Sequence, residues 1–104
     1  MSKETLTVLS KCIPVFTMLQ DENRQRILML LFDSHSMTVS ELTNHLALSR
    51  PAVSHHLKLL LDCGLIKVVK NGKERIYSLS MDRAIHLLRS LLKSLEMDMN
   101  SAPE

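Results

Sequence analysis

The side chains best suited to chemistry lie on a short stretch from Arg50 to Lys58, near the middle of the chain. On a helix that turns by about 100° per residue, Val53, Leu57 and Leu60 fall on one line and leave a polar arc on the opposite side. The polar arc consists of Pro51, Ser54, His55, Lys58 and Asp62, with Arg50 at the exposed first turn. Hydroxyl, imidazole and cationic groups in this arrangement can hydrogen-bond to base edges and neutralise phosphates. The stretch is therefore a candidate recognition helix for nucleic acid.

The members of the polar arc have different candidate roles. Ser54 and His55 can donate hydrogen bonds to base edges or accept them, and Arg50 can pair with guanine or hold a phosphate. Lys58 is better suited to a phosphate. His56 lies at the edge of the apolar line, so we expect it to be half-buried and structural.

A second basic cluster lies between residues 67 and 75, where four residues are Lys or Arg and one is acidic. Asn71-Gly72 separates two runs rich in Ile, Val and Tyr, and this dipeptide predicts a two-residue hairpin turn between strands over 65–70 and 73–79. The resulting cross-strand pairs are Ile66 with Tyr77, Val68 with Arg75, and Lys70 with Lys73. A local basic patch is the electrostatic footprint of a phosphate-binding surface. The candidate phosphate contacts in this hairpin are Lys70, Lys73 and Arg75.

Capping residues predict a short helix before the recognition helix. Ser40 is a good N-cap for a helix over 41–46, and Ser49 is one for the helix that follows. A short helix, a tight connection, a second helix and a basic hairpin are the parts of a winged helix-turn-helix, with the helix-turn-helix at 40–63 and the wing at 65–79. Such a unit binds duplex DNA through its second helix. Ser40, at the start of the first of these helices, joins the candidate DNA contacts.

Two apolar helices flank this unit. The first, over 1–19, contains Pro14 and is expected to bend before it, because proline removes a backbone hydrogen bond. The last, over 81–99, is capped by Ser80 and precedes a tail, 100–104, that is expected to fray. The last helix carries more apolar surface than one small core uses, and a second copy of the chain would cover it. The predicted homodimer interface consists of Leu6, Leu9, Ile13, Phe16, Ile85, Leu88, Leu92 and Leu95.

The remaining features fit one domain over residues 1–104. Asp21 caps a further helix over 22–32, and residues 37–39 are expected to form an edge strand. The predicted fold is mainly α with a small β-hairpin, about five helices and a two-stranded wing. The chain has 45% hydrophobic residues and a net charge of +2, which is mildly basic. No apolar run is long enough to span a membrane and no signal peptide is evident, so we expect a cytoplasmic protein.

These pieces resemble the ArsR-like (ArsR/SmtB) bacterial winged-helix regulators over nearly the whole chain. The most specific motif is Leu48-Ser49-x-x-x-Val53-Ser54-His55-His56-Leu57-x-x-Leu60, supported by Asp21-x-x-Arg24-x-x-Ile27-Leu28, Ser40-Glu41-Leu42, Gly64-Leu65, Asn71-Gly72-Lys73 and Tyr77-Ser78-Leu79. The resemblance implies a homodimeric repressor that binds double-stranded DNA at a palindromic operator and is released by an effector. It also implies that the first and last helices form the dimer interface.

The residues leave the effector open. A metal site of this family uses Cys-x-Cys in the third helix, but residues 41–46 contain no cysteine. Asp82 and His86 lie one helical turn apart and cannot by themselves complete a four-ligand site. We therefore expect no metal and no cofactor. Cys12 and Cys63 are candidates for a redox switch, which requires partly exposed thiols near positive charge.

Other classes of function fit less well. The chain has no glycine-rich phosphate loop and no nucleophile elbow, so we do not expect an enzyme. Besides a metal- or thiol-switched sensor of the same fold, a small organic effector, a protein partner or the absence of any ligand are open alternatives. A winged-helix protein-interaction module without DNA binding is the alternative from another class. Binding to DNA would weaken steeply as salt rises, which separates the two.

Overall fold

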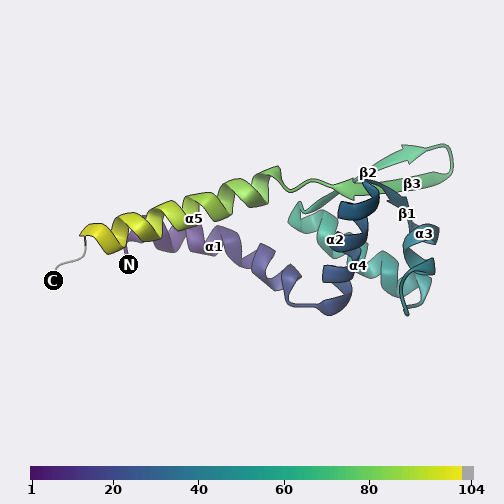
Figure 1. The fold of residues 1–104 in the computed structure, drawn as a ribbon, viewed down its shortest axis with the longest axis horizontal. Helices are drawn as coiled ribbons and strands as arrows, with labels where there is room; N and C mark the ends of the chain where they lie inside the picture. Colours follow the sequence, from purple (N-terminus) through teal and green to yellow (C-terminus); the bar gives the residue numbers. More distant parts are fainter. Residues whose placement is uncertain (102–104) are drawn as a thin grey trace.

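The computed structural model describes residues 1–101, and in it two helices project from a winged helix-turn-helix (Figure 1). The elements follow in the order α1 (Lys3–Leu19), α2 (Glu22–Ser34), β1 (Met37–Thr38), α3 (Val39–Asn44), α4 (Arg50–Cys63), β2 (Ile66–Asn71), β3 (Glu74–Leu79) and α5 (Asp82–Ser101). The predicted fold class is confirmed, with the expected edge strand pairing to β3 in an antiparallel sheet of order β1-β3-β2. We call α1 and α5, which lie side by side and run antiparallel, the rod.

The core forms around α4. Val53, Leu57 and Leu60, the predicted apolar line of this helix, each have 0% of their surface exposed. They pack in one cluster with buried side chains of α2, α3 and the sheet. The helix ends as expected at Gly64, whose φ of 81° is a left-handed conformation that glycine adopts without strain. The opposite side of α4 is therefore left free by its packing.

The short helix α3 is capped differently from the prediction. Thr38, rather than Ser40, is the N-cap. Its Oγ1 accepts a hydrogen bond from the Glu41 amide at 3.2 Å, and Glu41 Oε1 accepts one from the Thr38 amide at 3.1 Å. This reciprocal capping box satisfies two amide groups at once, which a cap at Ser40 would not achieve. The helix consequently starts earlier, and the Ser40 hydroxyl is free for another partner.

The hairpin turn is also displaced from the prediction. Its two loop residues are Gly72 and Lys73, because Asn71 pairs with Glu74. Gly72 has a φ of 66°. A two-residue turn with glycine at its first central position needs a positive φ only there, whereas the predicted Asn-Gly turn needs one at both positions. Each residue of β2 therefore faces a partner two positions further along β3, but every side chain remains on its predicted face.

The cross-strand pairs between β2 and β3 consequently differ from those predicted from the sequence. Val68 lies opposite Tyr77 rather than Arg75, and Lys70 lies opposite Arg75 rather than Lys73. Ile66 lies opposite Leu79.

A polar contact joins the ends of the rod. The Ser2 amide and the Thr5 hydroxyl donate hydrogen bonds to Asp98 Oδ2 at 2.9 and 2.7 Å. These bonds, that of Ser2 first, hold the pKa of the Asp98 carboxyl below its ordinary value. Thr5 itself is completely buried. The first helix thus meets α5 through a hydroxyl as well as through apolar groups.

Other boundaries of the rod differ slightly from the sequence prediction. Pro14 lies inside α1 without dividing it. Helix α5 begins one residue later than expected, with Met81 O accepting the first helical hydrogen bond from Ile85, so Ser80 is not its cap. Asn100 and Ser101 continue α5 rather than fraying, and the rest of the predicted tail, 102–104, lies outside the described residues. Within residues 1–101 no helix is long and apolar enough to cross a membrane.

Replacing Leu57 by alanine tests the central role of α4. We expect Leu57→Ala to lower the free energy of unfolding by about 2–5 kcal/mol, because a completely buried leucine leaves a cavity. Urea unfolding followed by circular dichroism measures the change. Lys58→Ala, an exposed neighbour on the same helix, is the control and should shift stability by less than about 0.5 kcal/mol. Equal stability of both variants would contradict this packing.

Candidate nucleic-acid interface

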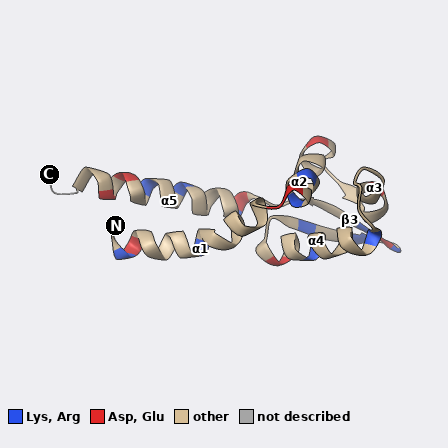
Figure 2. Cartoon of the chain, turned by 90° about the horizontal axis from the view of Figure 1, so that it is seen from below, with Lys and Arg blue, Asp and Glu red and all other residues tan. Residues whose placement is uncertain are grey.

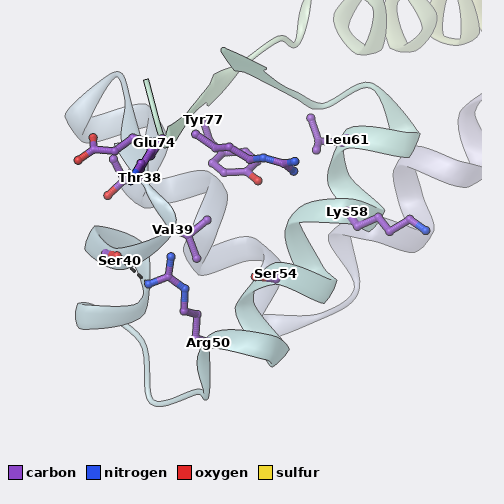
Figure 3. Close-up of a pocket in the computed structure, with 11 residues that line it drawn as sticks. Thr38, Val39, Ser40, Arg50, Ser54, Lys58, Leu61, Glu74 and Tyr77 are labelled. Atoms are coloured by element: carbon purple, nitrogen blue, oxygen red, sulfur yellow. Dashed lines mark hydrogen bonds between the residues drawn. The ribbon is translucent and has the colours of Figure 1, made fainter. Parts of the chain in front are cut away.

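One groove gathers most of the predicted DNA contacts. It lies between the start of α3, the exposed side of α4, and the wing turn with the start of β3. Its volume is about 670 Å³. The predicted residues that line it are Ser40, Arg50, Ser54, Lys58, Lys73 and Arg75. In Figure 3 the side chains of Arg50 and Tyr77 point into the space between α3, α4 and the wing, whereas Lys58 extends away from it. Residues predicted from two separate stretches of sequence thus meet at one surface.

A hydrogen bond between α3 and α4 orients the arginine of the groove. Arg50 Nη1 donates to Ser40 Oγ at 2.9 Å, and both side chains are otherwise exposed (Figure 3). The bond exists because Thr38 caps α3 and leaves the Ser40 hydroxyl free. Holding a long side chain in one conformation lowers the entropy that it loses on binding. Arg50 is therefore preorganised to meet an acceptor.

The groove also contains residues that the sequence argument missed. These are Thr38, Val39, Leu61, Glu74 and Tyr77. Glu74 is the one carboxylate among the lining residues, beside four cationic side chains. Tyr77 is only 5% exposed. The sequence does contain a hint of this position. A tyrosine in a core strand brings a hydroxyl that needs a hydrogen-bond partner, whereas a phenylalanine would not.

Three predicted DNA contacts are exposed but do not line the groove. Pro51 and His55 lie on the outer surface of α4. Lys70 lies on β2 directly opposite Arg75, so the two cationic side chains project from the same face of the wing. Figure 2 shows Lys and Arg on α4 and β3, at the end of the molecule away from the termini. The rod consists mainly of uncharged residues and carries both basic and acidic side chains.

Arg24 of α2 connects α4 to the end of α1. Its guanidinium donates to the Met18 carbonyl at 3.0 Å and the Thr17 carbonyl at 3.4 Å, at the end of α1. Arg24 Nη1 also lies 3.4 Å from His56 Nδ1. Because arginine only donates, this ring nitrogen is the acceptor. His56 is half-buried and structural, as predicted.

The candidate dimer residues lie on the outside of the rod. Helix α1 meets α5 through the buried residues Thr5 and Cys12, which bond Asp98 and the Leu87 carbonyl, and not through its predicted stripe. Leu6 is 50% exposed and Ile13 is 51% exposed. The α5 residues Ile85, Leu88 and Leu92 are also exposed, and Leu9, Phe16 and Leu95 are partly so. The stripe is consequently available to a partner.

Comparison with known proteins points to one family. Residues 21–68 match the family described as "Bacterial regulatory protein, arsR family". The chain is 32% identical over 79 residues to an uncharacterised HTH-type transcriptional regulator of Methanocaldococcus jannaschii, covering 76% of this chain and 89% of that protein. It is 40% identical to the arsenical resistance operon repressor of Escherichia coli, covering 65% of this chain and 58% of the repressor.

Solved structures give the same result over more of the chain. An ArsR-like transcriptional regulator from Rhodococcus sp. RHA1 superposes with a TM-score of 0.79 at 32% sequence identity. The superposition covers 93% of this chain and 89% of that one. It therefore includes the rod as well as the winged helix-turn-helix.

Neither cysteine thiol is fully exposed. Cys12 is completely buried, and its Sγ lies 3.5 Å from the Leu87 carbonyl, to which it donates. Burial raises the pKa of the half-buried Cys63 thiol, and nearby Arg83 only partly offsets this. Within residues 1–101 no three His, Cys, Asp or Glu side chains of one chain gather into a metal-binding group.

Thiol modification tests this description. In the native protein, Cys12 and Cys63 should react with Ellman's reagent at pH 8 more slowly than free cysteine, because the thiolate is the reactive form and access is restricted. Both should react fully once guanidinium unfolds the chain. In Cys63→Ser, the remaining Cys12 should stay unreactive until unfolding. Fast modification of that variant in its native state would contradict the burial of Cys12.

Proposed function

Since the chain belongs to the ArsR family of DNA-binding transcriptional regulators, we propose that it is a homodimeric repressor that binds a palindromic operator in the cytoplasm. Helix α4 enters the major groove, where Ser54 and His55 face base edges. Arg50, Lys58, Lys73 and Arg75 contact phosphates or bases beside it. The observation that carries this proposal is the groove in which side chains of α4 and the wing converge. Its relatives are regulators and not enzymes, in agreement with the sequence prediction.

The electrostatics of the wing support the same contacts. Lys70 and Arg75 are directly opposite in the β2–β3 register. Like charges in this position repel each other and destabilise a sheet. A phosphate close to both converts the repulsion into two attractions. The pair is therefore better explained by a polyanionic ligand than by the stability of the free protein.

The shape of the molecule supports a dimer. Its radius of gyration is 16.8 Å, compared with about 13 Å for a compact domain of roughly 100 residues. The difference arises because the rod extends away from the core and leaves Leu6, Ile13 and Leu92 in solvent. A two-fold partner would cover these stripes and set two α4 helices about 34 Å apart, one turn of DNA.

The proposed repressor must also be released from DNA. In a repressor of this kind an effector or a chemical modification shifts the dimer towards a geometry that fits DNA less well. Cys12, which is buried, and Cys63, whose thiol pKa is raised by partial burial, are weak candidates for that switch. A small organic effector, a protein partner or the absence of any ligand are the alternatives to a thiol or metal switch. A winged-helix interaction module would leave the clustered cations unexplained.

Charge removal in the groove tests DNA binding. A preferred duplex is first selected with the wild-type protein from a random pool. Arg50→Ala and Lys73→Ala should weaken binding to every duplex and flatten the plot of log affinity against log salt by about 0.9 for each lost phosphate contact. Ser54→Ala should instead alter the order of preferred sequences. Fluorescence anisotropy across a salt series measures all three.

The matched control for these variants is Lys67→Ala. Lys67 is also an exposed cation of β2, but it faces a different cavity with Phe32 and His35. Its removal should leave both affinity and salt dependence close to those of the wild type. If Lys67→Ala and Lys73→Ala weaken binding equally, the groove is not the interface.

A charge on the rod tests the dimer. The wild type should have twice the 11.8 kDa mass of the chain in light scattering at micromolar concentration. Leu92→Glu, at a position that is 60% exposed, should yield the monomer, because the proposed interface would bury the carboxylate without a partner. Phe32→Glu, 71% exposed on α2, is the control and should stay dimeric. A wild-type monomer would contradict the proposal.

A further inference from the structure

Tyr77 has a buried ring and a hydroxyl at the groove. It lies on the central strand β3, between Met37 of β1 and Val68 of β2, and is 5% exposed. The ring belongs to the hydrophobic core, yet the residue also lines the groove. In Figure 3 the ring extends into the middle of the groove, with its oxygen at the end away from the strand.

The Tyr77 hydroxyl forms no hydrogen bond with any group in residues 1–101. Every fully buried side-chain nitrogen or oxygen in this part of the chain does have a partner. The hydroxyl oxygen is therefore not sealed in the core, and it reaches solvent where the residue lines the groove. Buried tyrosines normally find a partner for this group. The missing partner is expected to come from a ligand in the groove.

The surroundings specify an anionic acceptor. Arg50, held by Ser40, lines one side of the groove, and Lys73 and Arg75 line the other. Phosphate oxygens accept hydrogen bonds both from cations and from neutral hydroxyls. A phenol fixed by core packing also loses little side-chain entropy when it binds, unlike the flexible lysines around it.

We propose that the Tyr77 hydroxyl donates a hydrogen bond to a backbone phosphate of bound duplex DNA and so sets the position of the wing against the duplex. This inference rests on the proposed DNA-binding function and adds to it a neutral, rigid contact. Tyr77 is a positioning residue for the DNA backbone and reads no base. Its contribution is the same for all sequences that enter the groove.

The neutral charge of the phenol gives the contact a distinctive signature. A lysine or arginine that binds a phosphate releases counterions, so its loss changes the salt dependence of binding. A phenol neutralises no charge. Tyr77→Phe should therefore weaken binding by the same factor at every salt concentration, about tenfold for each hydrogen bond to a charged acceptor and so about a hundredfold for the two copies in a dimer. Lys73→Ala should instead alter the slope.

The experiment compares Tyr77→Phe with Ser78→Ala on the duplex selected by the wild type. Ser78→Ala also removes one hydroxyl from β3. Ser78 is the next residue on the strand, but it points to the opposite face, towards Lys67 and Phe32. Anisotropy titrations should show about hundredfold weaker binding of the dimer for Tyr77→Phe with an unchanged salt slope, and wild-type binding for Ser78→Ala. Binding of Tyr77→Phe within about twofold of the wild type would overturn the inference.

A second measurement keeps the test independent of the stability of the variant. Tyr77 is the one tyrosine in the sequence, so ring-labelled tyrosine gives a single assigned NMR signal in the wild-type protein. Its Cζ shift should change on binding the duplex, and the change should disappear when one symmetric pair of phosphates is replaced by methylphosphonate. If the Cζ shift does not change when the duplex with unmodified phosphates binds, the inference is overturned while the proposed function stays intact. A wild type that binds no duplex would overturn both.

Discussion

The packing of α4 is the interaction on which the other features depend. Val53, Leu57 and Leu60 have no exposed surface, and together they fix the rotation of the helix about its own axis. That rotation decides which side chains remain outside, and they include Arg50, Ser54 and Lys58. The burial of three aliphatic side chains is worth several kcal/mol. A recognition surface with few internal contacts is in this way held in place by apolar groups behind it.

Arg24 extends this control beyond the helix. It bonds the carbonyls at the end of α1 and lies against His56 of α4. The rod and the recognition helix therefore share a side chain, and their relative orientation depends on it. In a dimer formed through the rod, this contact helps to determine the spacing of the two recognition helices.

The groove and the adjacent wing contain features that do not stabilise the free protein. Its cations line one groove, Lys70 on the wing beside it is opposite Arg75, and the Tyr77 hydroxyl has no protein partner within the described residues. The repulsion between the like charges costs some stability in the free protein. Natural proteins break such rules mainly at functional sites. The opposite face of the wing, with Lys67 and Ser78 paired, does not concentrate charge in this way.

The sequence by itself determined the helices, the exposed face of α4, the basic wing and the family. These features depend on local periodicity, capping chemistry and a contiguous motif, all of which can be read along the chain. Tertiary structure decided between local alternatives of similar strength. Thr38 and Ser40 are both good caps, and the reciprocal bond with Glu41 selected Thr38. Asn71-Gly72 and Gly72-Lys73 are both plausible turns, and the pairing of β3 with two strands fixed the second. The groove exists only because α3, α4 and the wing fold together, so the placement of Tyr77 in it, between core and solvent, depended on contacts distant in sequence.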